Sequence, residues 1–506
     1  MHPFARVTRP KPRHLTNPTH HHENPHHKSR WAILAILGLA QLMVVLDGTI
    51  VNIALPSAQA DLGFSDANRQ WIITAYALAF GSLLLFGGRL SDLFGRKRVF
   101  IIGLIGFAGA SALGGLAQDF TVLVTARALQ GAFGALLAPA ALSLLTTTFT
   151  DPNERGKAFG IYGAIAGGGG ALGLLLGGVL TEYLSWRWCL WVNLLLAVPA
   201  VIFGMVLLRH ARSSEKAHLD LPGVFTSVAG LLALVYGFAT AQTDGWSAGI
   251  TIGMLSAGVI LLTLFVIIEM RVANPLLPLR VVLERNRGGS YLALALASMA
   301  LFGVFLFLTY YLQTTLGYSP VTTGLAFLPM IGAIMVTATT STAFILPRTG
   351  PRIPMTIGLA LGAIGMVLLT QIGVSTPYAS HVLPGLVVTG LGLGLVFAIS
   401  FEVGTMGVHK SDAGVASAMV NTTGQVGGSI GTALLSTLFA TAVASFLTTA
   451  ADPGSQLAQA EAAVHGYSVA FWWSAVMFLV AAVACAFILT SGVPEHDPDA
   501  PGVVAA

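Results

Sequence analysis

The segment GRLSDLFGRKR, residues 88–98, decides the fold because it separates two long apolar stretches. These stretches, 70–88 and 99–117, are each close to the roughly 20 residues that a helix needs to cross a bilayer core. Gly95 permits a tight turn between two such helices, because glycine adopts backbone conformations that other residues avoid. Three basic residues follow it, and such residues favour the cytoplasmic face. The segment therefore predicts a short inner loop between two membrane-spanning helices.

Fourteen apolar stretches of spanning length occur along the chain, which has 506 residues, 55% of them hydrophobic and 9% charged. A soluble domain carries about 25% charged residues, so this chain lacks the polar surface that water requires. We therefore predict an all-α polytopic membrane protein with fourteen transmembrane helices, whose longest outer loop lies at about 448–467. The predicted spans are 31–55, 70–88, 99–117, 120–146, 156–180, 188–208, 223–242, 248–269, 289–312, 321–346, 353–373, 382–403, 413–447 and 468–491.

The basic residues predict how these helices are oriented. With the N-terminus placed inside, 22 of the 25 Lys and Arg residues fall on the inner side, two fall outside, and Arg127 lies within a span. Loops rich in Lys and Arg stay in the cytoplasm, so this asymmetry is typical of a membrane protein in its native orientation. We expect a multi-pass protein of the cell (inner or plasma) membrane with both termini cytoplasmic.

The chain also repeats itself in parallel. Gly95 and Gly350 lie in inner loops 255 residues apart, and glycine-rich spans around Gly173 and Gly428 have the same separation. Two six-helix halves related by an axis along the membrane normal are typical of an alternating-access transporter, with the substrate site between the halves. The predicted parts are a disordered His-rich tail (1–30), a first six-helix bundle (31–210), two inserted helices with linkers (211–288), a second, pseudo-equivalent six-helix bundle (289–491) and a second tail (492–506).

Four stretches resemble the major facilitator superfamily, and within it the fourteen-helix drug/proton antiporter branch of the multidrug resistance exporter type. They are LDGTIVNIALP (46–56), GRLSDLFGRKR (88–98), RALQGAFG (127–134) and GAIAGGGGALGLLLGG (163–178). The resemblance covers nearly the whole chain after residue 30. It implies a cytoplasmic latch at the second stretch, which comprises Gly88, Asp92, Gly95, Arg96, Lys97 and Arg98. Gly88 is expected to allow close helix contact, and the alternative function of the stretch, a positive-inside anchor, is compatible with a latch.

Asp47 and Arg127 are the ionisable residues that the resemblance assigns to proton coupling. Each lies about seven residues from the outer end of its span, so both lie roughly 10 Å below the outer surface at 1.5 Å per residue. A charged side chain inside a span is costly and is expected to have a partner. We expect the two to form a pair that protonation breaks and remakes; the alternative is a structural ion pair without proton traffic.

The glycine-rich fifth span resembles the motif that separates exporters from importers. Its glycines are Gly163, Gly167, Gly169, Gly173, Gly177 and Gly178. The sequence departs from the family pattern at Leu174, where proline is usual, so the helix keeps a backbone hydrogen bond and loses a bend point. The surrounding glycines still permit close helix packing.

The sequence indicates the role of the other polar residues in the spans less clearly. Glu402 is a possible second acid or an interfacial residue, and Gln130, Asn421 and Gln425 either line a central cavity or join helices. The N-terminal tail holds seven of the thirteen His residues, which we interpret as a solvated segment rather than a metal site. The sequence has no G-x-x-x-x-G-K-[ST] loop, HExxH motif or well-spaced Ser/His/Asp set, so we predict neither an enzyme nor a cofactor or metal.

Together these features predict a proton-coupled antiporter that exports small organic molecules, such as drugs, antibiotics or related hydrophobic or cationic compounds, by alternating access. Its expected partners are the substrate, protons and the lipid bilayer, with no nucleic acid and no evident obligate protein partner. The alternatives are an exporter of one endogenous metabolite and a proton-coupled importer.

Overall fold

The computed structural model describes residues 29–149, 152–208, 220–272, 275–408 and 413–492. In this part of the chain fourteen helices have at least 18 residues, and each overlaps one predicted span. They are α1 (Arg30–Leu62), α2 (Asp66–Phe94), α3 (Arg96–Gly115), α4 (Phe120–Thr148), α5 (Pro152–Tyr183), α6 (Trp188–Leu207), α7 (Leu221–Asp244), α8 (Gly249–Glu269), α10 (Arg285–Tyr310), α11 (Pro320–Thr340), α13 (Arg352–Leu369), α15 (Leu383–Thr405), α16 (Ala413–Thr449) and α17 (Gln456–Ile488). Short helices α9 (Leu279–Val282), α12 (Leu346–Thr349) and α14 (Tyr378–His381) and π-helical segments η1 (Tyr311–Thr315) and η2 (Ser341–Ile345) complete the described elements.

The fourteen-helix prediction is confirmed. The chain forms helices because its spans are apolar and lie in lipid. A helix forms all its backbone hydrogen bonds internally, and lipid offers no other partners for the backbone N–H and C=O groups. Thirteen of the helices are long and apolar enough to cross a membrane, and the other, α5, has 32 residues. In the most apolar stretch of α8 only 17% of the residues are buried, against 67% in α10. Helix α8 therefore presents most of its apolar surface outward, whereas α10 lies inside the bundle.

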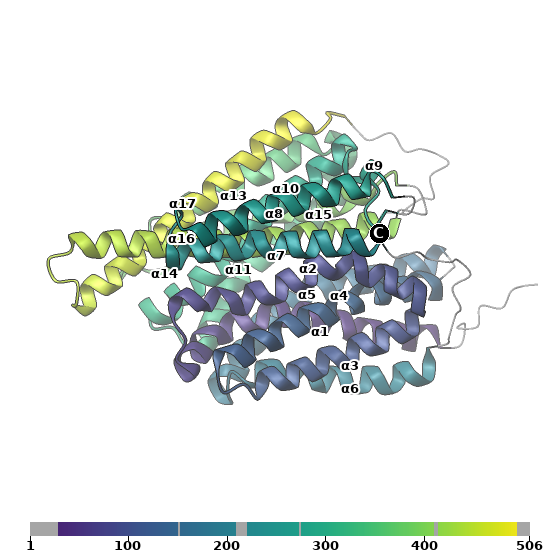
Figure 1. Cartoon of the computed structure of the whole chain (residues 1–506), viewed down its shortest axis with the longest axis horizontal. Helices are drawn as coiled ribbons and strands as arrows, with labels where there is room; N and C mark the ends of the chain where they lie inside the picture. Colours follow the sequence, from purple (N-terminus) through teal and green to yellow (C-terminus); the bar gives the residue numbers. More distant parts are fainter. Residues whose placement is uncertain (1–28, 150–151, 209–219, 273–274, 409–412, 493–506) are drawn as a thin grey trace, which may run out of the picture.

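The helices run between two ends of the molecule, which we call the base and the crown. The base contains the start of α1 and the end of α17, and the crown contains the end of α1 and the start of α17 (Figure 1). Gly95 and Gly350, the two repeated glycines, both lie at the base with positive φ, at 91° and 70°. Few other residues adopt this conformation easily, which explains glycine at both turns.

Helices α1–α6 and the set α10, α11, α13, α15, α16 and α17 pack in the same order. In the first set α1 packs against α5 and α6, while α4 packs against α2 and α3. In the second set α10 packs against α16 and α17, while α15 packs against α11 and α13. The inserted pair α7 and α8 packs together, and α7 lies against α2 and α16 (Figure 1). The two halves meet where α2 packs on α16 and where α5 packs on α11.

The prediction of a long outer loop at 448–467 is wrong, because α17 begins at Gln456. The first turns of α17, QLAQAEAAVHGY, are too polar to be recognised as a span but are rich in strong helix formers. The Ser455 side chain accepts a hydrogen bond from the Ala458 amide and caps the helix. The end of α16 and the start of α17 therefore form a helical hairpin at the crown (Figure 1). Most of the two predicted tails, 1–28 and 493–506, lies outside the described residues.

Candidate functional site

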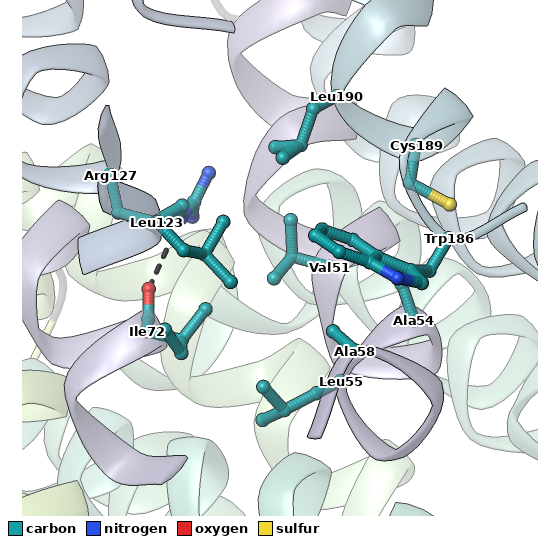
Figure 2. Close-up of a pocket in the computed structure, with 10 residues that line it drawn as sticks. All are labelled: Val51, Ala54, Leu55, Ala58, Ile72, Leu123, Arg127, Trp186, Cys189 and Leu190. Carbon is teal, nitrogen blue, oxygen red and sulfur yellow. Dashed lines mark hydrogen bonds between the residues drawn. The ribbon is translucent and has the colours of Figure 1, made fainter. Parts of the chain in front are cut away.

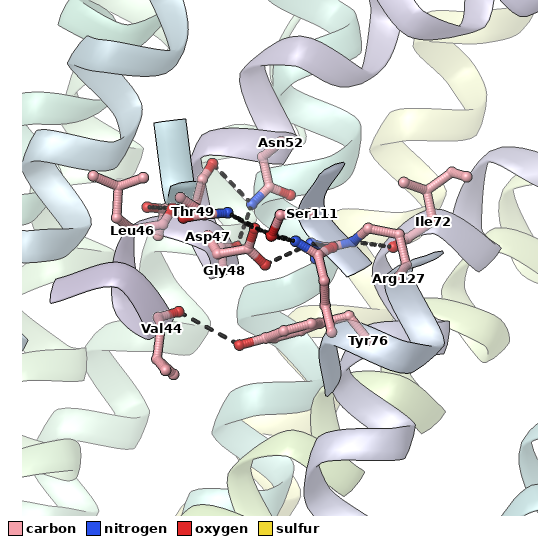
Figure 3. A network of polar contacts seen from close by, with 12 residues as sticks. Val44, Leu46, Asp47, Gly48, Thr49, Asn52, Ile72, Tyr76, Ser111 and Arg127 are labelled. Atoms are coloured by element: carbon pink, nitrogen blue, oxygen red, sulfur yellow. Dashed lines mark hydrogen bonds and ion pairs between the residues drawn. The ribbon is translucent and has the colours of Figure 1, made fainter. Parts of the chain in front are cut away.

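Asp47 on α1 and Arg127 on α4, the two predicted ionisable residues, are in contact inside the first half. Arg127 Nη1 donates a hydrogen bond to Asp47 Oδ2 at 2.5 Å (Figure 3). Asp47 is fully buried and Arg127 is 2% exposed. Because each charge would be costly alone in this apolar environment, each stabilises the ionised form of the other.

Three further polar residues complete the site, and they come from α3, α4 and α6. Asn193 Nδ2 donates to Asp47 Oδ1 at 2.7 Å, and Gln130 Nε2 donates to the same oxygen at 3.0 Å. Both amides also donate to the Ser111 hydroxyl oxygen, at 3.3 Å and 2.7 Å. All three side chains are fully buried. The Asp47 carboxylate thus receives donors from two carboxamides besides the guanidinium.

Arg127 has partners that do not depend on the Asp47 charge. Its Nε donates to the Ile72 carbonyl at 3.1 Å, and its Nη1 donates to Gln130 Oε1 at 2.8 Å. The guanidinium lies 4.4 Å from the centre of the Tyr76 ring, whose hydroxyl is bonded to the Val44 carbonyl (Figure 3). A planar guanidinium suits this combination of bonds and ring contact. Arg127 would therefore stay in place if Asp47 became neutral.

A narrow apolar pocket lies beside Arg127 on the crown side (Figure 2). Its wall is formed by α1, α2, α4, α6 and the connection before α6, through Val51, Ala54, Leu55, Ala58, Ile72, Leu123, Trp186, Cys189 and Leu190. Toward the crown surface, the Trp186 indole donates to Asp61 Oδ2 at 3.0 Å, and Arg187 forms an ion pair with the same carboxylate. The pocket therefore lies between the buried pair and a charged group at the surface.

The glycines of α5 set how closely this helix approaches its neighbours. A methyl group on Gly173 would lie 1.9 Å from Thr49 Oγ1, and one on Gly177 would lie 2.9 Å from the Ile50 carbonyl oxygen, so α5 rests directly on α1. At Gly178 the neighbour is the backbone of α11. Gly169 approaches Val45 of α1, and the surroundings of Gly163 and Gly167 lie outside the described part. Buried Leu174, at the position where proline was expected, contributes its backbone to the contact with Gly324 of α11.

The loop motif at the base is only partly as expected. The close helix contact is made by Gly87, where a methyl group would lie 2.1 Å from the Ala135 carbonyl oxygen, and not by Gly88, where the nearest atom would be 3.8 Å away. Lys97 donates to the Met205 carbonyl at 2.7 Å and so ties the loop to the end of α6. Arg96 is half-buried and Arg98 is exposed, whereas the Asp92 side chain lies outside the described part.

Of the remaining predicted residues, Gln130 joins the buried pair, whereas Asn421, Gln425 and Glu402 lie on other helices. Gln130, expected at a cavity wall, belongs instead to the network around Asp47. Asn421 is exposed on α16 and bonds the Ser417 carbonyl of its own helix, and Gln425 on the same helix lies against Gly81 of α2. Glu402 is half-buried in the last turn of α15. Sequence reasoning missed Ser111 and assigned no role to Asn193, although an Asn within an apolar span is a usable signal.

Comparison with known proteins is consistent with this architecture. The family model of the major facilitator superfamily matches residues 37–432. The chain is 50% identical to the puromycin resistance protein pur8 of Streptomyces alboniger, over 92% of this chain and 93% of that one. It is 38% identical to the cephamycin export protein CmcT of Amycolatopsis lactamdurans, over 89% and 90%. It is 33% identical to the multidrug efflux pump LfrA of Mycolicibacterium smegmatis, over 81% of each.

The fold is also similar to that of solved transporters. The crystal structure of a bacterial homologue of the human lysosomal transporter Spinster, in an inward-facing and occupied conformation, has a TM-score of 0.63 at 14% identity and covers 90% of this chain and 96% of that chain. The nucleoside transporter NupG has a TM-score of 0.61 at 12% identity, covering 90% and 100%. With a matching family model over most of its length and a relative that is 50% identical over 92% of the chain, the chain belongs to the major facilitator superfamily and is a multi-pass membrane transporter, not an enzyme.

Proposed function

We propose that this transporter is a proton-coupled antiporter that exports small organic molecules of the antibiotic or drug class by alternating access. The relatives support the substrate class, because their names refer to puromycin resistance, cephamycin export and multidrug efflux. With the base in the cytoplasm, as the 22 inner basic residues favour, export runs from the base to the crown. Both termini are then cytoplasmic.

The buried Asp47–Arg127 pair is the observation that carries the coupling proposal. A proton on Asp47 neutralises one partner of an ion pair 2.5 Å long and weakens the acceptor that Asn193 and Gln130 share. Arg127 keeps its bonds to Ile72 and its contact with Tyr76. The loss of the charge therefore loosens the contact between α1 and α4 without ejecting the guanidinium, which is what a reversible proton switch requires.

The apolar pocket supports entry of the proton from the crown in this proposal. Its lining includes Arg127 and Trp186 (Figure 2), and the Trp186 indole bonds Asp61 near the surface. Its wall is apolar, so only transient water would carry a proton along it, and ions would be excluded. In the proposed cycle the proton enters from the crown, neutralises Asp47, and leaves toward the base after the halves have rocked.

Contacts between the halves at the crown support an arrangement that is closed at that end. The Val321 amide of α11 donates to Glu182 of α5 at 3.0 Å, and the Gln313 side chain of η1 donates to the Ile53 carbonyl of α1 at 3.0 Å. Substrate would then enter from the base. In this proposal 31–210 and 289–491 are the two moving bundles.

Efflux of a panel of compounds tests this function. Cells producing the wild-type chain should expel puromycin and cationic dyes, and Asp47→Asn should abolish expulsion driven by the proton gradient. Glu461→Gln is the matched control, because it removes a carboxylate at an exposed position of α17 and should be neutral. Unchanged efflux in Asp47→Asn would overturn the coupling. Wild-type cells that expel no compound of the panel would favour a carrier of one endogenous metabolite, and net uptake would favour an importer.

A further inference from the structure

Two buried carboxyl groups lie together at the base, away from the Asp47–Arg127 pair. Asp220 precedes the first residue of α7, and Glu269 is the last residue of α8, so they close the base end of the inserted hairpin. Their exposed fractions are 5% and 4%. Such burial is unusual for acidic residues, which are seldom buried without a partner.

One oxygen of each carboxyl group has a clear structural role. Asp220 Oδ1 accepts from the Gly223 amide at 3.0 Å and caps α7. Glu269 Oε2 accepts from the Leu277 amide at 2.9 Å and so holds the linker that leads to α10. These bonds explain why both residues are present but account for only half of their acceptors.

The other two oxygens, Asp220 Oδ2 and Glu269 Oε1, face one point. A methyl group on Gly223 would lie 2.3 Å from the first and 2.7 Å from the second. Both atoms are buried, and neither has a donor among the residues that the structure describes. Two acceptors that face each other with no donor between them would be unfavourable, since an unsatisfied buried oxygen costs about 1–3 kcal/mol, and more if charged.

Basic side chains in the described part of the chain do not resolve this arrangement. Arg89 of α2 donates to the Pro275 carbonyl at 2.9 Å, and the side chains of Arg271 after α8 and Arg280 on α9 are exposed. A divalent cation is not favoured either, because the described residues contain no group of three or more His, Cys, Asp or Glu side chains able to hold a metal. Among the described residues, a single proton is the ligand that fits best, since it converts one carboxyl into a donor toward the other.

We propose that Asp220 and Glu269 together form a second proton-binding site, in which one proton is shared between Asp220 Oδ2 and Glu269 Oε1. The shared proton ties the start of α7 to the end of α8 and to the linker at Leu277. Arg89 connects that linker to α2 of the first half through Pro275. Loss of the proton leaves two facing carboxylates that repel, so the clamp opens as the pH at the base rises. The placement of the base in the cytoplasm rests on the proposed function. The shared proton does not depend on it.

Infrared spectroscopy of the purified full-length protein in lipid tests the shared proton directly. A protonated carboxyl has a carbonyl band that shifts in D₂O, and the wild type should show such a band at neutral pH. Asp220→Asn and Glu269→Gln should each lose it, because the carboxamide then donates to a remaining carboxylate. Asn also retains the cap of α7, so the fold should persist.

Asp47→Asn is the matched control and should keep the band. A band that survives in both Asp220→Asn and Glu269→Gln, or is absent from the wild type, would overturn the second site. A band lost only in Asp47→Asn would assign the proton to Asp47, which overturns this proposal and leaves the antiporter proposal standing. If one variant fails to fold, the other decides by the same criterion.

Discussion

Asp47 is held by donors from two helices, α4 and α6, so its surroundings depend on residues far from it in sequence. Asn193→Ala removes the 2.7 Å donor to Asp47 Oδ1. Losing a donor to the ionised form favours the protonated form, so the pH profile of efflux should move to higher pH. A hydrogen bond to a charged group contributes about 1.5–3 kcal/mol, so its loss should be large enough to measure. Efflux rates measured across a pH series check this, and Asn421→Ala on α16 should leave the profile in place.

Arg127 contacts a carboxylate, a carbonyl and an aromatic ring at once, and lysine lacks the shape to do so. Arg127→Lys keeps the charge but should lose the bond to Ile72 and the contact with Tyr76. We expect at least a tenfold lower rate of proton-driven efflux, about 1.4 kcal/mol, with normal insertion into the membrane. Transport by the lysine variant at the wild-type rate would show that charge alone is sufficient.

At this scale the sequence predicts the charged residues of the site but not their polar neighbours. Asp47 and Arg127 are conspicuous because charges are rare inside apolar spans. Ser111 and Asn193 are not, because small polar residues also serve ordinary helix contacts, and only the packing of α3 and α6 decides that they face Asp47. The same reason explains why Gly87, and not Gly88, makes the close contact.

Among the helices, α5 and α1 approach closely enough to couple the glycine-rich motif to the site. Gly173→Ala would place a methyl group 1.9 Å from Thr49 Oγ1 and 3.0 Å from the Leu46 carbonyl oxygen, next to Asp47. Overpacking of this kind costs about 1–3 kcal/mol, so both thermal stability and efflux should fall. Gly170→Ala is the matched control, because its methyl group would meet Thr49 only at 3.9 Å. Equal melting temperatures for the two variants would contradict the close packing.

Helix boundaries show where hydropathy stops being informative. Each of the fourteen long helices is predicted, because a spanning helix must be apolar over most of its length. The start of α17 is missed because its first turns are polar and are stabilised by the Ser455 cap and by helix propensity. The π-helical segment η1 is missed for a different reason, since one extra residue per turn leaves no pattern in composition.

At the scale of the whole molecule, Arg69 of the first half contacts the second half at the crown. It belongs to α2, is 3% exposed, and lies 4.2 Å from the Tyr310 ring centre and 4.9 Å from that of Phe439, both in the second half. A desolvated cation–π contact contributes about 2 kcal/mol, so Arg69→Met should shift the population toward a crown-open state more than tenfold.

Labelling of a cysteine introduced between the halves at the crown measures that shift. Arg187→Met is the control, because Arg187 pairs with Asp61 inside the first half and should not alter access. Equal labelling of the two variants would show that Arg69 does not close the crown. Neither the aromatic partners nor their distance to Arg69 was predictable from sequence, because they lie more than 200 positions away along the chain.

Proton movement during substrate exchange tests the central claim most directly. In sealed vesicles containing the purified transporter and a pH-sensitive dye, addition of puromycin on the base side should drive protons in the opposite direction in the wild type. Asp47→Asn should exchange substrate across the membrane while the internal pH stays constant. Substrate-driven pH change that persists in Asp47→Asn, or substrate transport by the wild type with no pH change, would contradict coupling through Asp47 and Arg127.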